Sequence, residues 1–148
     1  MIYCDTSFLV ALNVRGEIFT PLASKIASEF DEAIPLIGIA ELEWKTRIHR
    51  GLGDGSLTPT QHVAILRRIE QDVSDGIIVR KSLTPADHLD CALKLSRTHA
   101  IKIPLRSLDI LHVAAAKLMK CREFASFDKR QRELASAEKM QLLPAKLP

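Results

Sequence analysis

The sequence contains few of the residues that define disulfide-rich or zinc-stabilised proteins. Only three of its 148 residues are cysteines, Cys4, Cys91 and Cys121, and no two of them are close together in the chain. An odd number of widely spaced cysteines argues against a disulfide framework and against a structural zinc site. We therefore expect reduced thiols, as in a cytoplasmic protein.

Long apolar runs are also missing. No run approaches the roughly 20 apolar residues that a membrane-spanning helix needs. The chain opens Met1-Ile2-Tyr3-Cys4-Asp5, which places a carboxylate where a secretory leader would have apolar residues after basic ones. We expect no signal peptide, no membrane association and a cytoplasmic location.

Several catalytic signatures do not occur. The sequence has no Gly-rich phosphate loop of the P-loop type, no HExxH zinc helix and no GxSxG nucleophile elbow. Aromatic residues make up only 5%, so base stacking is not a strong theme. The net charge of +3 is compatible with a polyanionic partner if the positive side chains gather on one face.

The remaining composition suits one compact domain over residues 1–148. Hydrophobic residues make up 47% and charged residues 26%, which is enough for a core and a solvated surface. No internal repeat, low-complexity segment or linker interrupts the chain.

Short apolar runs alternate with amphipathic segments. Strands are expected at 1–4, 33–38, 77–79 and 123–127, with an edge strand at 140–143. Helices are expected at 8–12, 21–30, 39–50, 58–75, 85–100, 108–120 and 128–139, with Thr6 or Ser7, Thr58, Thr84 and Ser107 as start signals and a break at Gly51, Gly53 and Gly55. This alternation predicts an α/β sandwich with a mostly parallel central sheet flanked by helices.

Four carboxylates lie at the expected junctions between strands and helices. Asp5 and Asp128 end strands, whereas Glu41 and Asp109 lie in the first turns of helices. Open parallel sheets bind ligands at the carboxyl ends of their strands, so these side chains can converge on one rim. Each one alone is also suited to cap a helix or to complement its dipole.

Clustered carboxylates indicate a particular chemistry. They repel one another unless a cation holds them, and Mg²⁺ or Mn²⁺ prefers such oxygen ligands. Bound ions of this kind activate water for phosphodiester hydrolysis without a side-chain nucleophile. A metal-dependent phosphodiesterase is therefore the leading hypothesis.

Four segments carry a family resemblance in order along essentially the whole chain: MIYCDTSFLVAL, PLIGIAELEWKTRIHR, RSLDILHVAAAKLM and FASFDKRQRELA. They resemble the acidic motifs of the PIN-domain ribonucleases, specifically the VapC-type toxins of type II toxin–antitoxin pairs. The resemblance implies a PIN-like three-layer sandwich and a Mg²⁺- or Mn²⁺-dependent endoribonuclease acting on RNA. It also implies a cognate antitoxin protein and a homodimer.

Transferred to this sequence, the resemblance makes Asp5, Glu41, Asp109 and Asp128 the catalytic metal ligands, Asp128 either directly or through water. Glu43 competes with Glu41, since residues two apart on a helix face different directions and only one can enter the site. The first-turn position and the family register favour Glu41. Thr6 and Ser7 are expected to position a ligand or a water.

Further side chains have two interpretations each. His112 shares the helix face of Asp109 and either supports the site or packs beside the core. Trp44 fills either the core or a dimer contact, and the apolar side of helix 58–75 either packs internally or receives the antitoxin. Candidate phosphate contacts are Lys45, Arg47, Arg50, Arg106, Lys129, Arg130 and Arg132, of which Arg106 and Arg130 lie within three residues of an expected ligand.

Other functions remain as alternatives. One is a PIN-domain nuclease that acts in RNA processing outside a toxin pair. Another is a non-catalytic PIN-like module that binds RNA or protein, which the four carboxylates argue against. A phosphotransferase of the haloacid-dehalogenase type would need an aspartate two residues after Asp5, where Ser7 stands instead.

Overall fold

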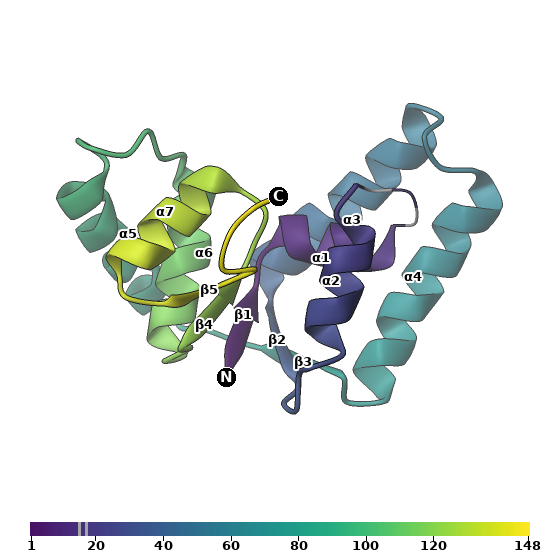
Figure 1. Cartoon of the computed structure of the whole chain (residues 1–148), viewed down its shortest axis with the longest axis horizontal. Coiled ribbons are helices and arrows are strands. Elements are labelled where there is room, and N and C mark those ends of the chain that lie inside the picture. Colours follow the sequence, from purple (N-terminus) through teal and green to yellow (C-terminus); the bar gives the residue numbers. More distant parts are fainter. Residues whose placement is uncertain (15, 17) are drawn as a thin grey trace.

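The computed structural model describes residues 1–14, 16 and 18–148, in which strands and helices alternate as expected (Figure 1). The strands are β1 (Ile2–Cys4), β2 (Ile34–Ile37), β3 (Ile78–Lys81), β4 (Glu123–Ala125) and β5 (Gln141–Leu143). The helices are α1 (Thr6–Asn13), α2 (Thr20–Ala27), α3 (Gly38–Gly53), α4 (Pro59–Ser74), α5 (Pro85–His99), α6 (Ser107–Leu118) and α7 (Lys129–Ala137). The predicted α/β class is confirmed.

Every strand pair is parallel. Strand β4 lies between β1 and β5, and β2 pairs with β3. Strand β1 lies beside β2, so the two groups of strands meet there (Figure 1). Because the strands point the same way, their carboxyl ends meet at one edge, where ligands bind in open α/β sheets.

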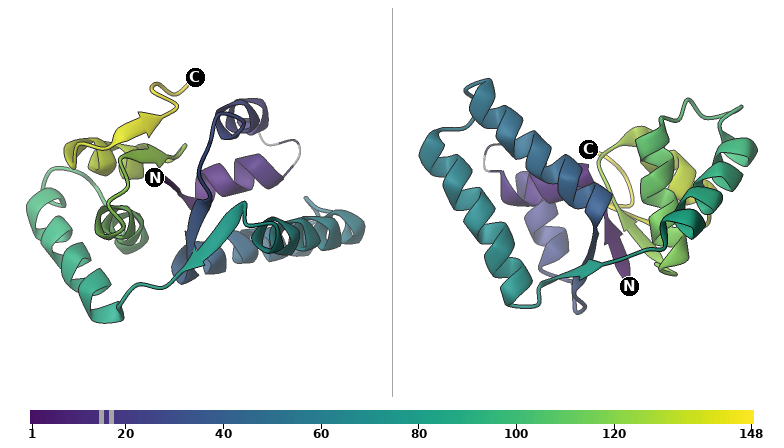
Figure 2. Two further views of the ribbon diagram at one scale, coloured as in Figure 1. Left: turned by 90° about the horizontal axis from the view of Figure 1, so that it is seen from below. Right: turned by 180° about the vertical axis from the view of Figure 1, so that it is seen from behind.

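Helices cover both groups of strands (Figures 1 and 2). Helices α5, α6 and α7 lie on the side of β4 and β5, whereas α1 to α4 lie on the side of β2 and β3. The core between them is filled by fully buried aromatic side chains, Tyr3, Phe8, Trp44 and Phe124. Trp44 therefore packs in the core rather than on an exposed face.

One expected cap is confirmed and two are corrected, the first being Ser107, because Arg106 rather than Ser107 occupies the N-cap position of α6. Thr58 begins α4 through the predicted cap, since its hydroxyl accepts from the backbone N–H of Gln61 at 3.2 Å and the Gln61 side chain accepts from the Thr58 N–H at 2.9 Å. Helix α1 is capped by Asp5 rather than by Thr6 or Ser7. A carboxylate that already ends β1 serves as the cap, because the helix begins at the next residue.

The expected glycine break after residue 50 is also corrected. Helix α3 continues through Gly51 and Gly53. Gly51 is buried against Leu57, and a Cβ atom at this position would lie 2.9 Å from the Leu57 Cδ1 atom. Gly51 therefore packs closely against Leu57 inside the helix rather than ending it.

Across the residues that the structure describes, no helix is long and apolar enough to cross a membrane.

Candidate active site

Asp5 occupies the carboxyl end of β1 and is completely buried. Its backbone N–H donates to the Ala125 carbonyl at 3.0 Å, which extends the pairing of β1 with β4 by one residue. The carboxylate accepts from the N–H of Phe8 at 2.9 Å and from the Ser7 and Ser126 hydroxyls, each at 2.7 Å. Burial raises the pKa of this carboxyl, and the three neutral donors act in the opposite direction.

Ser126 joins Asp5 to Asp128. Its hydroxyl donates to Asp5 Oδ2 at 2.7 Å and accepts from the Asp128 N–H at 3.0 Å. The Ser7 hydroxyl makes a similar bridge, because it contacts both Asp5 oxygens and accepts from the Phe127 N–H at 2.8 Å. The hydroxyls of Ser7 and Ser126 therefore connect the end of β1 to residues 126–128, which follow β4.

Asp128 begins α7 and reaches toward Asp109. Its Oδ1 atom accepts from the N–H groups of Arg130 and Gln131 at 2.9 and 3.2 Å, which caps the helix. Its Oδ2 atom lies 3.5 Å from a terminal nitrogen of Arg130. The capping oxygen and the ion-paired oxygen are thus different atoms of one carboxylate.

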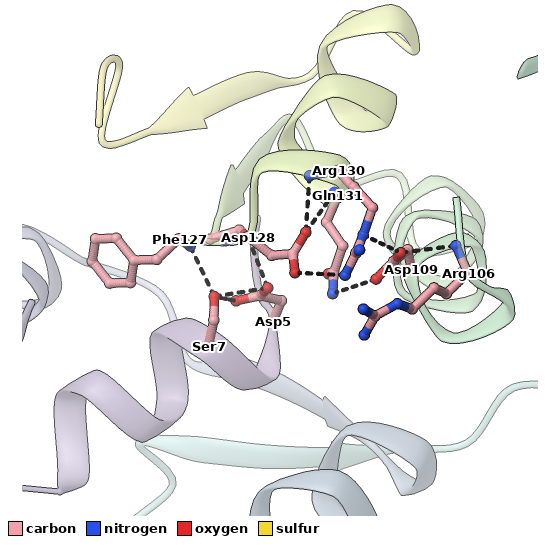
Figure 3. A network of polar contacts seen from close by, with 9 residues as sticks. Asp5, Ser7, Arg106, Asp109, Phe127, Asp128, Arg130 and Gln131 are labelled. Carbon is pink, nitrogen blue, oxygen red and sulfur yellow. Dashed lines mark hydrogen bonds and ion pairs between the residues drawn. The ribbon is translucent and has the colours of Figure 1, made fainter. Parts of the chain in front are cut away.

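Asp109 lies in the first turn of α6 and is 4% exposed. Its Oδ2 atom accepts from the Arg106 N–H at 2.9 Å and from Arg130 Nε at 3.0 Å. Gln131 Nε2 lies 3.5 Å from the other oxygen. Figure 3 shows Arg130 and Gln131 between the carboxylates of Asp109 and Asp128. A continuous series of contacts therefore joins Asp5, Asp128 and Asp109, which come from three distant segments.

Glu41 takes no part in these contacts. It is bound by the Arg80 guanidinium at 2.8 and 3.0 Å and by Lys45 at 2.7 Å. These hydrogen bonds, that of Arg80 foremost, lower the pKa of Glu41 to about 2. Glu41 therefore belongs to an ionic network between α3, β3 and Glu70 of α4.

Glu43, the competitor of Glu41, points toward α1 and α6 instead. It accepts from the Thr6 hydroxyl at 2.9 Å and contacts Nε2 of His112. The hydrogen bond with His112 is the main cause that lowers the pKa of Glu43. Of the two glutamates, Glu43 contacts Thr6, the residue next to Asp5, whereas Glu41 contacts Arg80 and Lys45.

His112 is completely buried and joins the core to Glu43. Its Nδ1 atom lies 2.7 Å from the Tyr3 hydroxyl, and its Nε2 atom faces Glu43 and, at 3.5 Å, the Thr6 hydroxyl. His112 therefore packs in the core, as one of its two interpretations expected, and it also contacts a carboxylate. Its charge when protonated favours the ionised form of Asp5.

The basic candidates divide into different groups. Arg130 lies between the carboxylates of Asp109 and Asp128. The Arg106 side chain is exposed, and its backbone N–H donates to Asp109. Arg132 is buried and donates to the carbonyls of Ser126 and Pro144, so it secures the C-terminal segment rather than offering a phosphate contact. Lys45 is ion-paired with Glu41 and Glu70.

Two features test whether a cation suits this edge. Asp5 is a buried carboxylate whose hydrogen-bond donors are neutral. Gln131 Oε1, beside Asp109, is buried and has no hydrogen-bond partner within the described part of the chain. Oxygen donors of this kind match the preference of Mg²⁺. Among the described residues, however, no three acidic, histidine or cysteine side chains are grouped closely enough to form a complete ligand set.

Three contributors were missed from the sequence: Ser126, Gln131 and Tyr3. For Ser126 a signal existed, because it lies two residues before Asp128 in an extended segment, where alternate residues share a face. Gln131 also had one, as the residue at the third position of a helix that Asp128 caps. Tyr3 looked like an ordinary core residue, and no pattern in the sequence indicates its hydrogen bond.

Comparisons with known proteins identify the family of this chain. The PIN domain family model matches residues 2–137, so the chain belongs to the PIN domain family. Proteins of this family are typically nucleases, and PIN nucleases generally use divalent metals. A search of curated proteins finds no match.

Two solved structures share the fold. One is Mycobacterium tuberculosis VapC20, a sarcin-ricin loop cleaving toxin, with a TM-score of 0.69 and 17% identity over 90% of this chain and 94% of that one. The other is FitAcB from Neisseria gonorrhoeae, with a TM-score of 0.67 and 17% identity over 96% of each chain. At this identity the likeness establishes the PIN fold, with parallel strands flanked by helices.

Proposed function

We propose that this protein is a metal-dependent endoribonuclease and the toxin of a type II toxin–antitoxin pair. The observation that carries the proposal is the series of contacts that links Asp5, Asp128 and Asp109 at the carboxyl edge of the parallel strands. Three carboxylates gathered from distant segments, one of them wholly buried, are costly for a structure that does not use them.

Each residue has a role in the proposed site. Asp5, Asp109 and Asp128 would hold Mg²⁺ or Mn²⁺, with Glu43 in place of Glu41 as the fourth carboxylate. Such an ion supplies an activated water and stabilises the charge on the phosphate. Ser7 and Ser126 orient Asp5, and Thr6 and His112 orient Glu43. Arg106 and Arg130 supply positive charge for the RNA backbone.

The toxin role rests on similarity and on one surface feature. A solved structure of the same fold is a toxin that cleaves the sarcin-ricin loop. A groove of about 1000 Å³ also lies between α2 and α4, and its lining combines apolar side chains such as Phe30 and Ile65 with polar ones such as Gln61, Arg68 and Asp72. The groove includes one side of the helix expected at residues 58–75 and is suited to an amphipathic antitoxin segment. The homodimer remains a prediction.

Cleavage of a mixture of ribosomal and transfer RNA tests the nuclease. We expect cleavage by the wild-type chain with Mg²⁺ or Mn²⁺, none in excess EDTA, and a loss of at least about 100-fold in Asp109→Asn. Lys94→Gln, on α5, is the matched control and should cleave like the wild type. Cleavage that persists in EDTA would falsify the metal-dependent mechanism.

A growth assay separates the toxin from an RNA-processing nuclease. Inducing the wild-type chain without its antitoxin should arrest growth, whereas Asp109→Asn should not. Unimpaired growth together with metal-dependent cleavage in vitro would instead support a PIN nuclease outside a toxin pair. If neither growth arrest nor cleavage occurs, the non-catalytic alternative is favoured.

A further inference from the structure

Arg130 occupies the space where the two outer carboxylates face each other. Its Nε atom donates to Asp109 Oδ2 at 3.0 Å, and a terminal nitrogen lies 3.5 Å from Asp128 Oδ2 (Figure 3). The carboxylates come from α6 and from the cap of α7, so the chain itself supplies the cation that joins them.

We propose that Arg130 is a resident counter-ion that leaves Asp109 when a divalent ion binds to this edge. The inference rests on the proposed function, since the competing cation is the metal of the nuclease. It adds a role for Arg130 before any RNA is present, beyond its expected contact with phosphate.

Arg130 and a metal ion compete for Asp109. A guanidinium has five N–H donors and no lone pair for a metal, so Arg130 cannot join the ligand set. Two cations on one carboxylate repel each other most where solvent is scarce, and Asp109 is only 4% exposed. The Arg130 guanidinium on Asp109 Oδ2 therefore weakens the binding of a metal ion to Asp109.

The surrounding hydrogen bonds allow the guanidinium to leave without unfolding the helix. The backbone N–H of Arg130 is held separately by Asp128 Oδ1 at 2.9 Å, so the start of α7 does not depend on the side chain. Asp109 keeps the N–H of Arg106 at 2.9 Å. The Arg130 side chain is 29% exposed and thus already reaches water.

Two consequences follow from this arrangement. Without metal, Arg130 neutralises a buried carboxylate and stabilises the fold, because an unpaired buried charge is costly. With metal, the released guanidinium stays at the same edge, where it can form charge-assisted hydrogen bonds to phosphate. Binding of the metal ion, which the proposed cleavage requires, would thus also release the Arg130 side chain for contact with the RNA phosphate.

Titration calorimetry with MnCl₂ and no RNA tests the exchange. Arg130→Met should bind Mn²⁺ about tenfold more tightly than the wild type, as expected when one charge-assisted hydrogen bond no longer competes. Lys129→Met removes the same charge from the exposed neighbouring residue and should change the affinity by less than about twofold because solvent screens it. Without Mn²⁺, Arg130→Met should melt at a lower temperature than the wild type, and saturating Mn²⁺ should close the gap.

An unchanged or weaker Mn²⁺ affinity in folded Arg130→Met overturns the inference and leaves the proposed function standing. Equal tightening in Lys129→Met also overturns it, because the effect would then be one of overall charge. No Mn²⁺ binding by any variant overturns the metal site and the inference together. Should Arg130→Met fail to fold, Arg130→Lys takes its place. The lysine keeps the positive charge but cannot contact Asp109 and Asp128 at the same time. The Mn²⁺ affinity of Arg130→Lys should therefore exceed that of the wild type by less than tenfold.

Discussion

At the scale of single residues, Asp5 is a buried carboxylate with a proposed metal-binding role. It is fully buried, and burial raises its pKa above the usual value of 3.8. The folded chain therefore holds this proton to a higher pH than the unfolded chain does. The contribution of Asp5 to stability is lost as the pH rises from about 3.8 through the raised pKa.

Asp5→Asn should consequently keep or increase the stability of the metal-free protein at pH 7 while it abolishes metal-dependent cleavage. The side-chain amide carries no buried charge, its oxygen can accept from the Phe8 N–H and the Ser7 hydroxyl, and its NH2 group can donate to the Ser126 hydroxyl oxygen. Urea denaturation of both proteins between pH 4 and 7 measures the difference, which should grow in favour of the variant as the pH rises. A difference that instead favours the wild type more strongly at pH 7 would contradict the burial cost.

Glu41 and Glu43 provide a matched pair of variants on one helix. Glu43→Gln should reduce cleavage by about 10- to 100-fold, because it removes the carboxylate beside Thr6 and His112. Glu41→Gln should cleave within about threefold of the wild type, since Glu41 contacts Arg80 and Lys45 instead. Initial rates of cleavage of one RNA by the two variants measure this difference. A larger loss in Glu41→Gln than in Glu43→Gln would support Glu41 as the site residue, as favoured from the sequence.

This pair also shows where sequence reasoning reached its limit. The aspartates follow strand ends and helix starts, and such positions are marked in the sequence by short apolar runs and by capping residues. The choice between Glu41 and Glu43 depends on the rotation of α3 about its axis. The spacing of Ala40, Trp44 and Ile48 marks the buried face of α3, but the sequence does not show which neighbours Glu41 and Glu43 meet on either side of that face.

At the scale of secondary-structure elements, an ionic network joins α3, α4 and β3. Arg80 and Lys45 lie between Glu41 and Glu70, and the hydrogen bonds hold the pKa of Glu41 at about 2 against its usual 4.5. A carboxyl with a lowered pKa stabilises the fold above pH 4.5 and loses this contribution as the pH falls toward 2.

Glu41→Gln should lower the free energy of unfolding by about 1 kcal/mol at pH 7, less than the pKa shift alone suggests because Arg80 is 43% exposed and screened by water. The difference from the wild type should shrink as the pH falls below 4.5. Chemical denaturation at pH 7 and pH 3 measures it, and an equal difference at both values would exclude the ion pair as its cause.

The start of α4 offers a test of stability away from the site. Thr58→Ala removes the hydroxyl that accepts from the Gln61 N–H and should cost about 1 kcal/mol of unfolding free energy. Its rate of RNA cleavage below the melting transition should equal that of the wild type. A large loss of activity in this folded variant would indicate that α4 contributes to the active edge.

The element boundaries were largely predictable, because alternating apolar runs and proline-marked helix starts are local signals. Two details differ from the expected boundaries. Helix α3 runs through Gly51 and Gly53. Asp5 caps α1 in place of Thr6 or Ser7, through a hydrogen bond from the Phe8 N–H that is local in the sequence, so the cap was one of several local possibilities.

At the scale of the whole molecule, the site depends on parallel pairing of the two ends of the chain. Strand β1 pairs with β4, which brings Asp5 beside Ser126, while α6 and α7 bring Asp109 to Asp128 through Arg130. Buried Arg132 fixes the segment that carries this arrangement by binding the carbonyls of Ser126 and Pro144. The candidate site is therefore a property of the tertiary fold, and unfolding either end should remove it.

The most direct test of the central claim is the rate of RNA cleavage by the wild type and by Asp5→Asn as the Mn²⁺ concentration is raised. If three carboxylates form one metal-binding edge, the wild-type rate rises to saturation, and Asp5→Asn stays at least about 100-fold slower at every concentration while its melting temperature is preserved. Equal rates in the two proteins, or a wild-type rate that does not respond to Mn²⁺, would contradict the account.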